Sequence, residues 1–443
     1  MKVGIVSLGC PKNQVDSEVM AGLLKKAGHN LTPDEYQADA IVVNTCSFIT
    51  EATEESIDTI LELSELKETS RLKYLIVTGC LSQRYKSSLV KELPEVDAYI
   101  GTGGFESIAE VLDGLMRSKP KKAESDFPDP LYIYSHDTPR VRFTPRHWGY
   151  VKISDGCNNR CTYCMIPSIR GGLRSRTAVS IKSEAAMMAA QGVKEICLIA
   201  QDITAYGDDR KNGGGLTGLL KQLEGVKGIE WLRLLYTHPA HYTEELIDFL
   251  ATSKKVVRYL DIPMQHIDDD ILKAMGRKID SSGIRSLVSS IRAKIPDVAL
   301  RTSLLVGFPG ETREKFAKLL RFVKEMEFDH VGVFGYSDEE GSPSSAFGRK
   351  VSEELIAERR DQLMKAQAKI TLKKNRARVG KTYKVLVDGP SKESEMLVAG
   401  RAYFQAPDVD GVIYITEGEV KPGEFAEVVI TEAHPYDLVG RAL

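Results

Sequence analysis

The segment YVKISDGCNNRCTYC, residues 150–164, joins a strand-like run to three closely spaced cysteines. Cys157, Cys161 and Cys164 follow the run YVKIS in the pattern C-x3-C-x2-C. Three thiolates in one short loop can hold three irons of a 4Fe-4S cube, whereas full ligation takes four. The fourth iron then keeps an open coordination position, which is the condition that chemistry at a metal requires.

A zinc knuckle is the main alternative for this loop. Structural zinc sites normally have four ligands, and no histidine stands at finger spacing from these cysteines. We therefore interpret the loop as an iron–sulfur site whose open iron binds the amino and carboxylate groups of S-adenosylmethionine (SAM). Electron transfer through that iron would break the sulfonium bond and release a 5′-deoxyadenosyl radical.

Strand-like runs continue after the loop, each with room for a helix before the next. After residues 150–154 they occupy 193–201, 230–236, 258–264, 299–307 and 330–336. Six β/α units are too few for a closed eight-fold barrel, so we predict a partial (β/α)6 barrel over residues 147–374. A charged helix over about 352–376 ends this part.

The N-terminal part, residues 1–117, also alternates strands and helices. Its apolar runs at 2–10, 39–48, 74–80 and 98–101 are separated by stretches of helical length. Buried strands at this spacing predict a doubly wound parallel sheet. A proline-rich break at 118–146 is predicted to be a linker.

The C-terminal part, residues 375–443, has short strands and turns without a helical pattern. It predicts a small antiparallel β-barrel of the oligonucleotide-binding type. From residue 380 onward it carries six basic and eleven acidic residues, a net charge of −5. A module that grips a phosphate backbone needs the opposite sign, so the charge favours a basic protein as partner over RNA. A merely solvated acidic face is the alternative.

Cys10, Cys46 and Cys80 form a second set of three. Each stands at the carboxyl end of a predicted parallel strand, and such ends meet at one edge of a doubly wound sheet. We expect these three to be neighbours that hold a second cluster, against the alternative of three unrelated buried cysteines. Cys197 lies inside an apolar strand and is expected to be a core residue.

Composition and charge limit the class of protein. Charged residues make up 28% and the net charge is −2, which is typical of a soluble globular protein without an overall attraction to nucleic acid. We find no signal peptide or membrane-spanning run and expect a cytoplasmic protein. There, cysteines serve metal binding or catalysis more often than disulfides.

The whole chain resembles the methylthiotransferases of the radical SAM superfamily. Their order is a three-cysteine domain, a radical barrel and a small barrel called TRAM. The resemblance implies two 4Fe-4S clusters. The one on Cys157, Cys161 and Cys164 generates a radical from SAM, and the other carries the sulfur, which a second SAM methylates. An external electron donor such as flavodoxin or ferredoxin is implied, and we expect a monomer.

The residues around Cys10 resemble one branch of this family. The sequence SLGCPKN-x-VDSE, residues 7–18, looks like the branch that modifies an aspartate of ribosomal protein S-12, whereas members acting on tRNA have a pattern such as GCQMN. The segments 200–202, 206–207 and 261–266 also look like that branch. The resemblance implies 3-methylthioaspartate as product. Modification of a tRNA adenosine is one alternative, and a non-catalytic metal protein with a docking barrel is another.

Further residues are candidates for cofactor contacts. The resemblance places Tyr163 beside the adenine of SAM, although a core aromatic is an open alternative. Gln201 and Asp202 stand where related enzymes have a Gly-Gly-Glu segment that contacts the methionyl amine. Arg170, Arg174 and Arg176 could bind a carboxylate of cofactor or substrate. Salt bridges at the surface are equally compatible with these three arginines.

Overall fold

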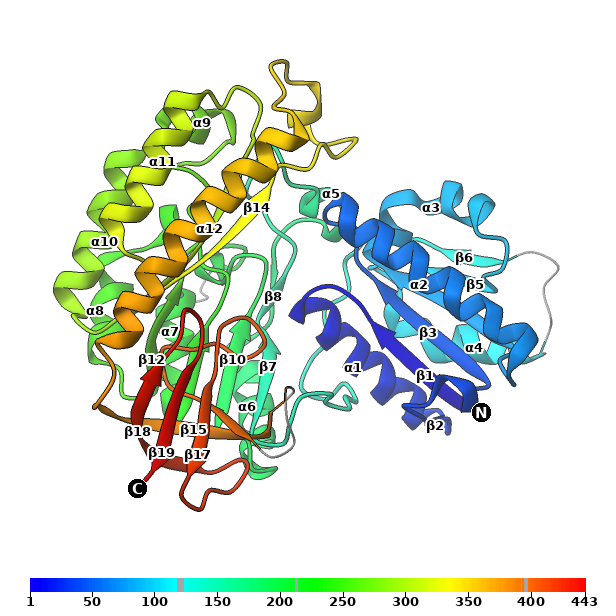
Figure 1. The fold of residues 1–443 in the computed structure, drawn as a ribbon. Coiled ribbons are helices and arrows are strands. Elements are labelled where there is room, and N and C mark those ends of the chain that lie inside the picture. The colour runs from blue at the N-terminus through cyan, green and yellow to red at the C-terminus, as the bar shows by residue number, and fades with distance from the viewer. Residues whose placement is uncertain (118–122, 212–213, 392, 394–396) are drawn as a thin grey trace.

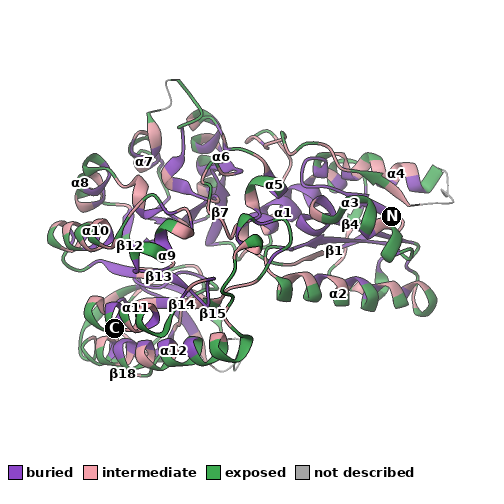
Figure 2. Ribbon diagram, turned by 90° about the horizontal axis from the view of Figure 1, so that it is seen from above, coloured by how far each residue is buried: buried purple, intermediate pink, exposed green. Residues whose placement is uncertain are grey.

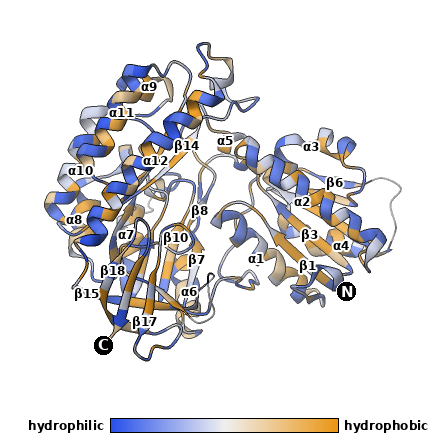
Figure 3. Cartoon of the chain, viewed as in Figure 1, coloured by the Kyte–Doolittle hydropathy of each residue, from blue (hydrophilic) through white to orange (hydrophobic). Residues whose placement is uncertain are grey.

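A computed structural model shows two parallel sheets and a closed barrel, built from consecutive parts of the chain, and a small two-stranded sheet of β8 (Ser154–Asp155) and β9 (Arg174–Ser175) (Figure 1). The structure describes residues 1–117, 123–211, 214–391, 393 and 397–443. Most strands of the two parallel sheets are buried and apolar, while the helices turn polar, exposed faces outward (Figures 2 and 3). This is the arrangement that alternating buried strands and amphipathic helices produce.

The N-terminal sheet is parallel throughout, as predicted. Its order is β2 (Asn30–Leu31), β1 (Lys2–Ser7), β3 (Ala40–Thr45), β4 (Tyr74–Gly79), β5 (Ala98–Ile100) and β6 (Glu124–Asp126). The helices are α1 (Pro11–Lys26), α2 (Thr50–Thr69), α3 (Cys80–Glu92) and α4 (Ile108–Arg117). The strand order reverses between β1 and β3, and ligands bind doubly wound sheets at the carboxyl ends beside such a reversal.

The proline-rich segment after α4 is more ordered than a free linker. Residues 118–122 lie outside the described residues, and Glu124–Asp126 form the edge strand β6. Further on, the chain crosses α1 so closely that a Cβ on Gly22 would overlap the Pro139 carbonyl. The Phe143 N–H donates to Glu18 at 2.9 Å. This segment therefore packs between the first two sheets.

The central sheet confirms the predicted partial barrel. Its six parallel strands run β7 (Trp148–Lys152), β10 (Glu195–Ile199), β11 (Trp231–Leu234), β12 (Val256–Asp261), β13 (Ala299–Val306) and β14 (His330–Gly335). The covering helices are α6 (Ala178–Ala190), α7 (Gly215–Glu224), α8 (Glu244–Thr252), α9 (Asp269–Ala274), α10 (Ser281–Lys294), α11 (Arg313–Met326) and α12 (Glu353–Arg376). Neither β7 nor β14 pairs with the other, so the barrel stays open.

The C-terminal strands close into a five-stranded barrel. The order is β15 (Thr382–Pro390), β16 (Val398–Arg401), β17 (Ile413–Glu417), β19 (Leu438–Ala442) and β18 (Phe425–Ala433). Four of its pairs are antiparallel, as predicted, and β17 with β19 is parallel. Among the described residues, no helix is long and apolar enough to cross a membrane.

One buried carboxylate joins this barrel to the central sheet. Glu195, at the start of β10, accepts from Arg233 and from Arg401, each at 2.6 Å. Glu195 and Arg233 are wholly buried and Arg401 is nearly so. Because three charged groups share one water-free contact, the small barrel is held in a defined orientation.

Candidate functional site

The cysteines of the C-x3-C-x2-C pattern lie in the loop between β8 (Ser154–Asp155) and the short helix α5 (Ile166–Arg170), beyond the carboxyl end of β7. Cys157, Cys161 and Cys164 are half-buried and line a pocket of about 520 Å³. Burial raises the pKa of the Cys157 thiol and raises that of Cys164 to about 12. A bound metal cation would offset the free-energy cost of ionising these buried thiols and would hold the sulfurs as thiolates.

The start of the loop is fixed by its backbone. The Cys157 N–H donates to the Gly171 carbonyl at 3.1 Å. Gly156 has φ +75°, and a Cβ there would overlap the Gly172 carbonyl. Glycine at 156 is thus required both by its left-handed conformation and by the close approach of the chain.

The second set of cysteines meets at the carboxyl edge of the N-terminal sheet. Cys10 directly precedes α1, Cys46 directly follows β3, and Cys80 begins α3 after β4. Gly9 packs against Cys46 so closely that a Cβ on it would lie 2.9 Å from the sulfur. The Asn13 side-chain oxygen is 3.7 Å from the Cys80 sulfur. The sequence prediction that these three cysteines are neighbours agrees with this placement.

Two cations distinguish the three thiols of this set. Burial, together with the neighbouring Cys80 and Cys10, raises the pKa of Cys46 to about 12. Burial also opposes ionisation of Cys10, but the Lys12 ammonium, the Arg170 guanidinium and hydrogen bonds from the backbone of Asn13 and Lys12 together outweigh it and lower the pKa of that thiol. Cys10 is therefore the sulfur most readily converted to a thiolate.

Helix α5 connects the two cysteine sets. It follows Cys164 directly, and Met165 and Ile169 form a buried apolar cluster with Cys80. At its end, the Arg170 guanidinium lies 3.8 Å from the Cys80 sulfur. Five residues of helix thus separate the cysteine loop of the barrel from the cysteine edge of the N-terminal sheet.

The three arginines after the loop are engaged within the chain. Arg170 pairs with Asp16 at 2.8 Å and with Asp155 at 3.2 Å, and all three are buried. Arg176 forms a buried pair with Glu184. These are interior pairs rather than the surface salt bridges considered from the sequence. The Arg174 guanidinium donates to backbone carbonyls, including that of Arg170 at 2.9 Å.

Gln201 and Asp202 both reach the cysteine loop of the barrel. The Gln201 amide donates to Asp155 at 2.8 Å, while its carbonyl oxygen is buried and has no partner among the described residues. The Asp202 carboxylate accepts from Asn159 at 2.7 Å. Tyr163 packs partly buried against the apolar cluster of Ile271, Met275, Leu305 and Phe308. Tyr163, a residue of the cysteine loop, therefore anchors the loop to that cluster.

Comparison with known proteins finds three family matches, one within each of the three parts of the chain. Residues 2–101 match uncharacterized protein family UPF0004, residues 151–323 match the radical SAM superfamily, and residues 379–443 match the TRAM domain. A ribosomal protein uS12 methylthiotransferase RimO of Geotalea uraniireducens is 49% identical over 99% of this chain and 98% of its own length. The corresponding protein of Geobacter sulfurreducens is 48% identical, over 100% and 98%.

The chain belongs to the RimO family.

It is accordingly a radical SAM methylthiotransferase, and its radical SAM domain implies a 4Fe-4S cluster and SAM. Solved structures show the same fold at low identity. The radical SAM methyltransferase TsrM of Kitasatospora setae, solved with cobalamin and a [4Fe-4S] cluster, has a TM-score of 0.56 and 16% identity over 75% of this chain and 74% of its own. The cobalamin-dependent enzyme OxsB has a TM-score of 0.54 and 12% identity over 82% and 56%.

The structure adds residues of this RimO-family site that the sequence did not single out. Arg277 lies with its guanidinium 3.8 Å from the Cys161 sulfur and donates to the Pro263 carbonyl at 2.6 Å. Asn159 ties the cysteine loop to Asp202. Asn159 lies between Cys157 and Cys161, so its position within the cysteine pattern could have marked it as a site residue. Arg277 stands more than a hundred residues away, and no local pattern marks it.

Two histidines complete the surroundings of Asp202. His241 is 2.9 Å from its carboxylate, and the rings of His241 and His238 stack at 4.6 Å. Burial, with Arg277 nearby, lowers the pKa of His238 to about 3. Its Nδ1 accepts from the Ala240 N–H at 3.2 Å, so His238 is a neutral ring whose other nitrogen carries the proton.

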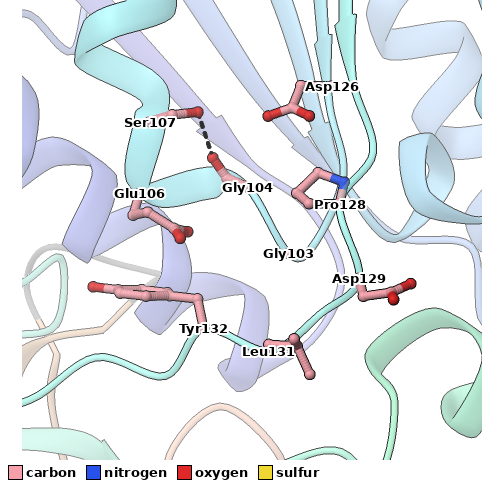
Figure 4. Close-up of a pocket in the computed structure, with 9 residues that line it drawn as sticks. All are labelled: Gly103, Gly104, Glu106, Ser107, Asp126, Pro128, Asp129, Leu131 and Tyr132. Atoms are coloured by element: carbon pink, nitrogen blue, oxygen red, sulfur yellow. Dashed lines mark hydrogen bonds between the residues drawn. The ribbon is translucent and has the colours of Figure 1, made fainter.

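A second pocket, of about 430 Å³, lies beside β6 in the N-terminal part (Figure 4). Its lining residues are Gly103, Gly104, Glu106, Ser107, Asp126, Pro128, Asp129, Leu131 and Tyr132. Ser107 donates to the Gly104 carbonyl at 2.7 Å. Among the described residues, this lining holds three carboxylates and neither a cysteine nor a cation, unlike the two cysteine sets of the RimO-family site.

Proposed function

We propose that this chain inserts sulfur and a methyl group at the β-carbon of an aspartate in ribosomal protein uS12, giving 3-methylthioaspartate. Relatives 47–49% identical over 99–100% of the chain, which are named ribosomal protein uS12 methylthiotransferases, support this substrate. The observation that carries the proposal is the pair of three-cysteine sets at the two ends of α5. One set would supply a radical and the other a sulfur, and the reaction needs both at one substrate carbon.

Cys157, Cys161 and Cys164 would hold the cluster that works with SAM. The residues fit such a group, because three thiols share one pocket and a fourth cysteine is absent from its lining. When bound, the cluster supplies the electron that cleaves SAM to methionine and a 5′-deoxyadenosyl radical. Arg277, which contacts Cys161, would balance the negative charge of the thiolates.

Cys10, Cys46 and Cys80 would hold the second 4Fe-4S cluster, which carries the sulfur. These three thiols also fit, because they meet at the sheet edge where ligands of doubly wound folds bind. The charges of Lys12 and Arg170 favour the thiolate of Cys10, the form that binds iron. One SAM would methylate the sulfur, and a second would be consumed as the radical source.

Gln201 and Asp202 would position SAM at the first cluster. The buried, unpartnered carbonyl oxygen of Gln201 is an acceptor for the methionyl ammonium. Asp202, fixed by Asn159 and His241, would accept from a further polar group of SAM. Tyr163, whose ring borders the loop, would lie beside the adenine.

The remaining partners follow from this chemistry. Reduction of the cluster requires an external electron donor, such as flavodoxin or ferredoxin, and we propose a monomer that works in the cytoplasm. A protein substrate agrees with the charge of the C-terminal barrel. Two of its six basic residues, Lys384 and Arg401, are already paired with Glu230 and Glu195 of the central domain.

Iron content and product analysis test the proposal. Cluster-loaded enzyme should contain about eight irons per chain, because each cluster has four. The Cys46→Ala variant should fall to about four, while Cys197→Ala, which changes a buried cysteine outside both sets, should keep about eight. Four irons in the unaltered enzyme would contradict the two-cluster proposal.

The substrate is tested in the same preparation. Reduced enzyme is incubated with SAM and either a peptide from the uS12 loop that contains the aspartate or a tRNA anticodon stem-loop. Mass spectrometry should show a methylthio addition to the peptide alone. Modification of the RNA alone would show that the substrate is tRNA and not a ribosomal protein.

A further inference from the structure

Lys12 is a buried cation at the junction between the two halves of the site. It lies on the first turn of α1, two residues after Cys10, and only 8% of its surface is exposed. Its ammonium nitrogen is 3.2 Å from the centre of the Tyr236 ring, which belongs to the central barrel. The Lys12 side chain therefore reaches from the second cysteine set across to the mouth of the barrel.

Lys12 differs from the buried cations Lys152 and Arg170 by lacking an acidic partner. Among the described residues, no Asp or Glu forms an ion pair with it. Lys152 and Arg170, which are more deeply buried than Lys12, share the carboxylates of Asp16 and Asp155. Burying an ammonium without an anion is costly, and the face of an aromatic ring compensates it only in part. An anion from outside the chain would complete this environment.

Lys12 contacts a residue that is bonded to the part of the barrel proposed to bind SAM. The Tyr236 carbonyl accepts from the Ile203 N–H at 3.0 Å, directly beside Asp202 and its contact to the barrel's cysteine loop. Tyr236 itself has φ +64°, a conformation that a bulky residue holds only where its surroundings enforce it. Lys12 thus follows Cys10 by two residues and contacts Tyr236, whose carbonyl is bonded to the residue after Asp202.

From this arrangement we propose that Lys12 binds the side-chain carboxylate of the aspartate that is modified, and so selects an acidic residue as substrate. The inference rests on the proposed function. The β-carbon of an aspartate is bonded directly to its carboxylate carbon. A cation that holds the carboxylate therefore also fixes the C–H bond that must face both the radical and the sulfur.

The other cations of the site are committed elsewhere. Arg170 and Arg176 already pair with buried carboxylates, and Arg174 donates to backbone carbonyls. Arg277 contacts Cys161, on the side of the site assigned to SAM. Among the described residues near Cys10, Lys12 is the buried cation that forms no ion pair with a carboxylate.

Binding of matched peptides tests this assignment. Two uS12-loop peptides, differing only in Asp or Asn at the target position, are titrated against cluster-loaded enzyme, Lys12→Met and Lys12→Arg. The unaltered enzyme should bind the Asp peptide at least about tenfold more tightly than the Asn peptide, since one ionic hydrogen bond is gained. Lys12→Met should lose this preference by weakening the Asp peptide alone, and Lys12→Arg should keep part of it. Lys26→Met, an exposed lysine of the same helix, should behave as unaltered enzyme.

A second readout separates substrate binding from a role at the cluster. Iron content and the electron paramagnetic resonance spectrum are measured for each variant without peptide. An unaltered Asp preference in Lys12→Met would overturn the inference, and so would loss of iron from that variant. If the unaltered enzyme modifies the Asp peptide while its preference over Asn is absent, the inference fails alone. If it modifies neither peptide, the proposed function fails together with it.

Discussion

The Arg170 guanidinium lies 2.8 Å from the Asp16 carboxylate, and both side chains are almost wholly buried. Asp16 belongs to α1 of the N-terminal domain, whereas Arg170 ends the helix that follows the barrel's cysteine loop. Lys152 joins the same carboxylate from β7. The sequence SLGCPKN-x-VDSE, which suggests the substrate branch, therefore also holds the two cysteine-bearing domains together.

Removal of the Arg170 charge should loosen this junction. Arg170→Ala leaves the buried carboxylates of Asp16 and Asp155 with one cation fewer, so we expect a loss of about 3–5 kcal/mol in the free energy of unfolding. Urea denaturation followed by circular dichroism measures it. The exposed Arg146→Ala should stay within about 0.5 kcal/mol of the unaltered protein. Equal stability of both variants would show that the pair contributes nothing.

Gln201→Ala should weaken SAM binding. The variant removes the buried carbonyl oxygen proposed to accept from the methionyl ammonium, and a hydrogen bond to a charged group corresponds to at least about a tenfold change in Kd. Isothermal titration of cluster-loaded enzyme with SAM gives the value. Gln362→Ala, an exposed residue of α12, is the matched control. A Kd within twofold of the value for the unaltered enzyme would show that Gln201 does not contribute to SAM binding.

His238 should make stability depend on pH in the acidic range. Its folded pKa of about 3 lies below the unfolded value of 6.5. Between these two pH values the unfolded chain binds a proton at His238 and the folded chain does not. The neutral ring is favourable above pH 6.5, and stability falls as the pH drops below that value. At pH 5.5 the loss is about 1.4 kcal/mol.

The His238→Asn variant isolates this effect. The asparagine oxygen can accept the Ala240 N–H in place of Nδ1, and the other seven of the eight histidines are the same in both proteins. Unfolding at pH 7.5 and 5.5 should show a smaller decline in the variant than in the unaltered protein. Parallel declines would mean that His238 titrates normally in the folded state.

Glu195→Gln should disturb the docking of the C-terminal barrel. The carboxylate faces two buried guanidinium groups, Arg233 and Arg401, which overcome the effect of burial and lower its pKa. Its contribution is therefore present above the ordinary pKa of a glutamate and is lost as the pH falls through the lower folded value. We expect the variant to lose about 3–5 kcal/mol.

Limited proteolysis locates the Glu195→Gln effect. Cleavage between α12 and β15 should be faster in the variant than in unaltered protein. Glu230→Gln removes a half-exposed partner of Lys384 at the same interface and should change the rate little. If the Glu195→Gln protein resists the protease as well as the unaltered protein does, apolar contacts rather than Glu195 hold the C-terminal barrel to the central domain.

The strands of both parallel sheets could be predicted because their signals are local. Apolar runs such as residues 40–45 and 74–79 are buried along their whole length, and a run of that kind identifies a strand by itself. The edge strand Glu124–Asp126 escaped prediction because its side chains are polar and only its backbone pairs. The parallel pairing of β17 with β19 also depends on distant partners rather than on either sequence.

The candidate site divides in the same way. Cys157, Cys161 and Cys164 are identified by spacing, and Cys10, Cys46 and Cys80 by their place after successive strands. The roles of the arginines after the loop could not be separated, since each had the same local context. Only the partner residues, which come from another domain, distinguish the buried pair of Arg170 from the backbone contacts of Arg174.

The sequence by itself determined the three-part α/β architecture, the two cysteine sets and the resemblance to a family, because spacing and periodicity are properties of neighbouring residues. The tertiary structure decided how these parts meet. It placed Arg170 against Asp16, Arg277 against Cys161 and the unpaired charge of Lys12 over Tyr236. Such contacts join residues more than a hundred positions apart, and they arise only when folding removes both partners from water and makes a matching charge or ring the favourable neighbour.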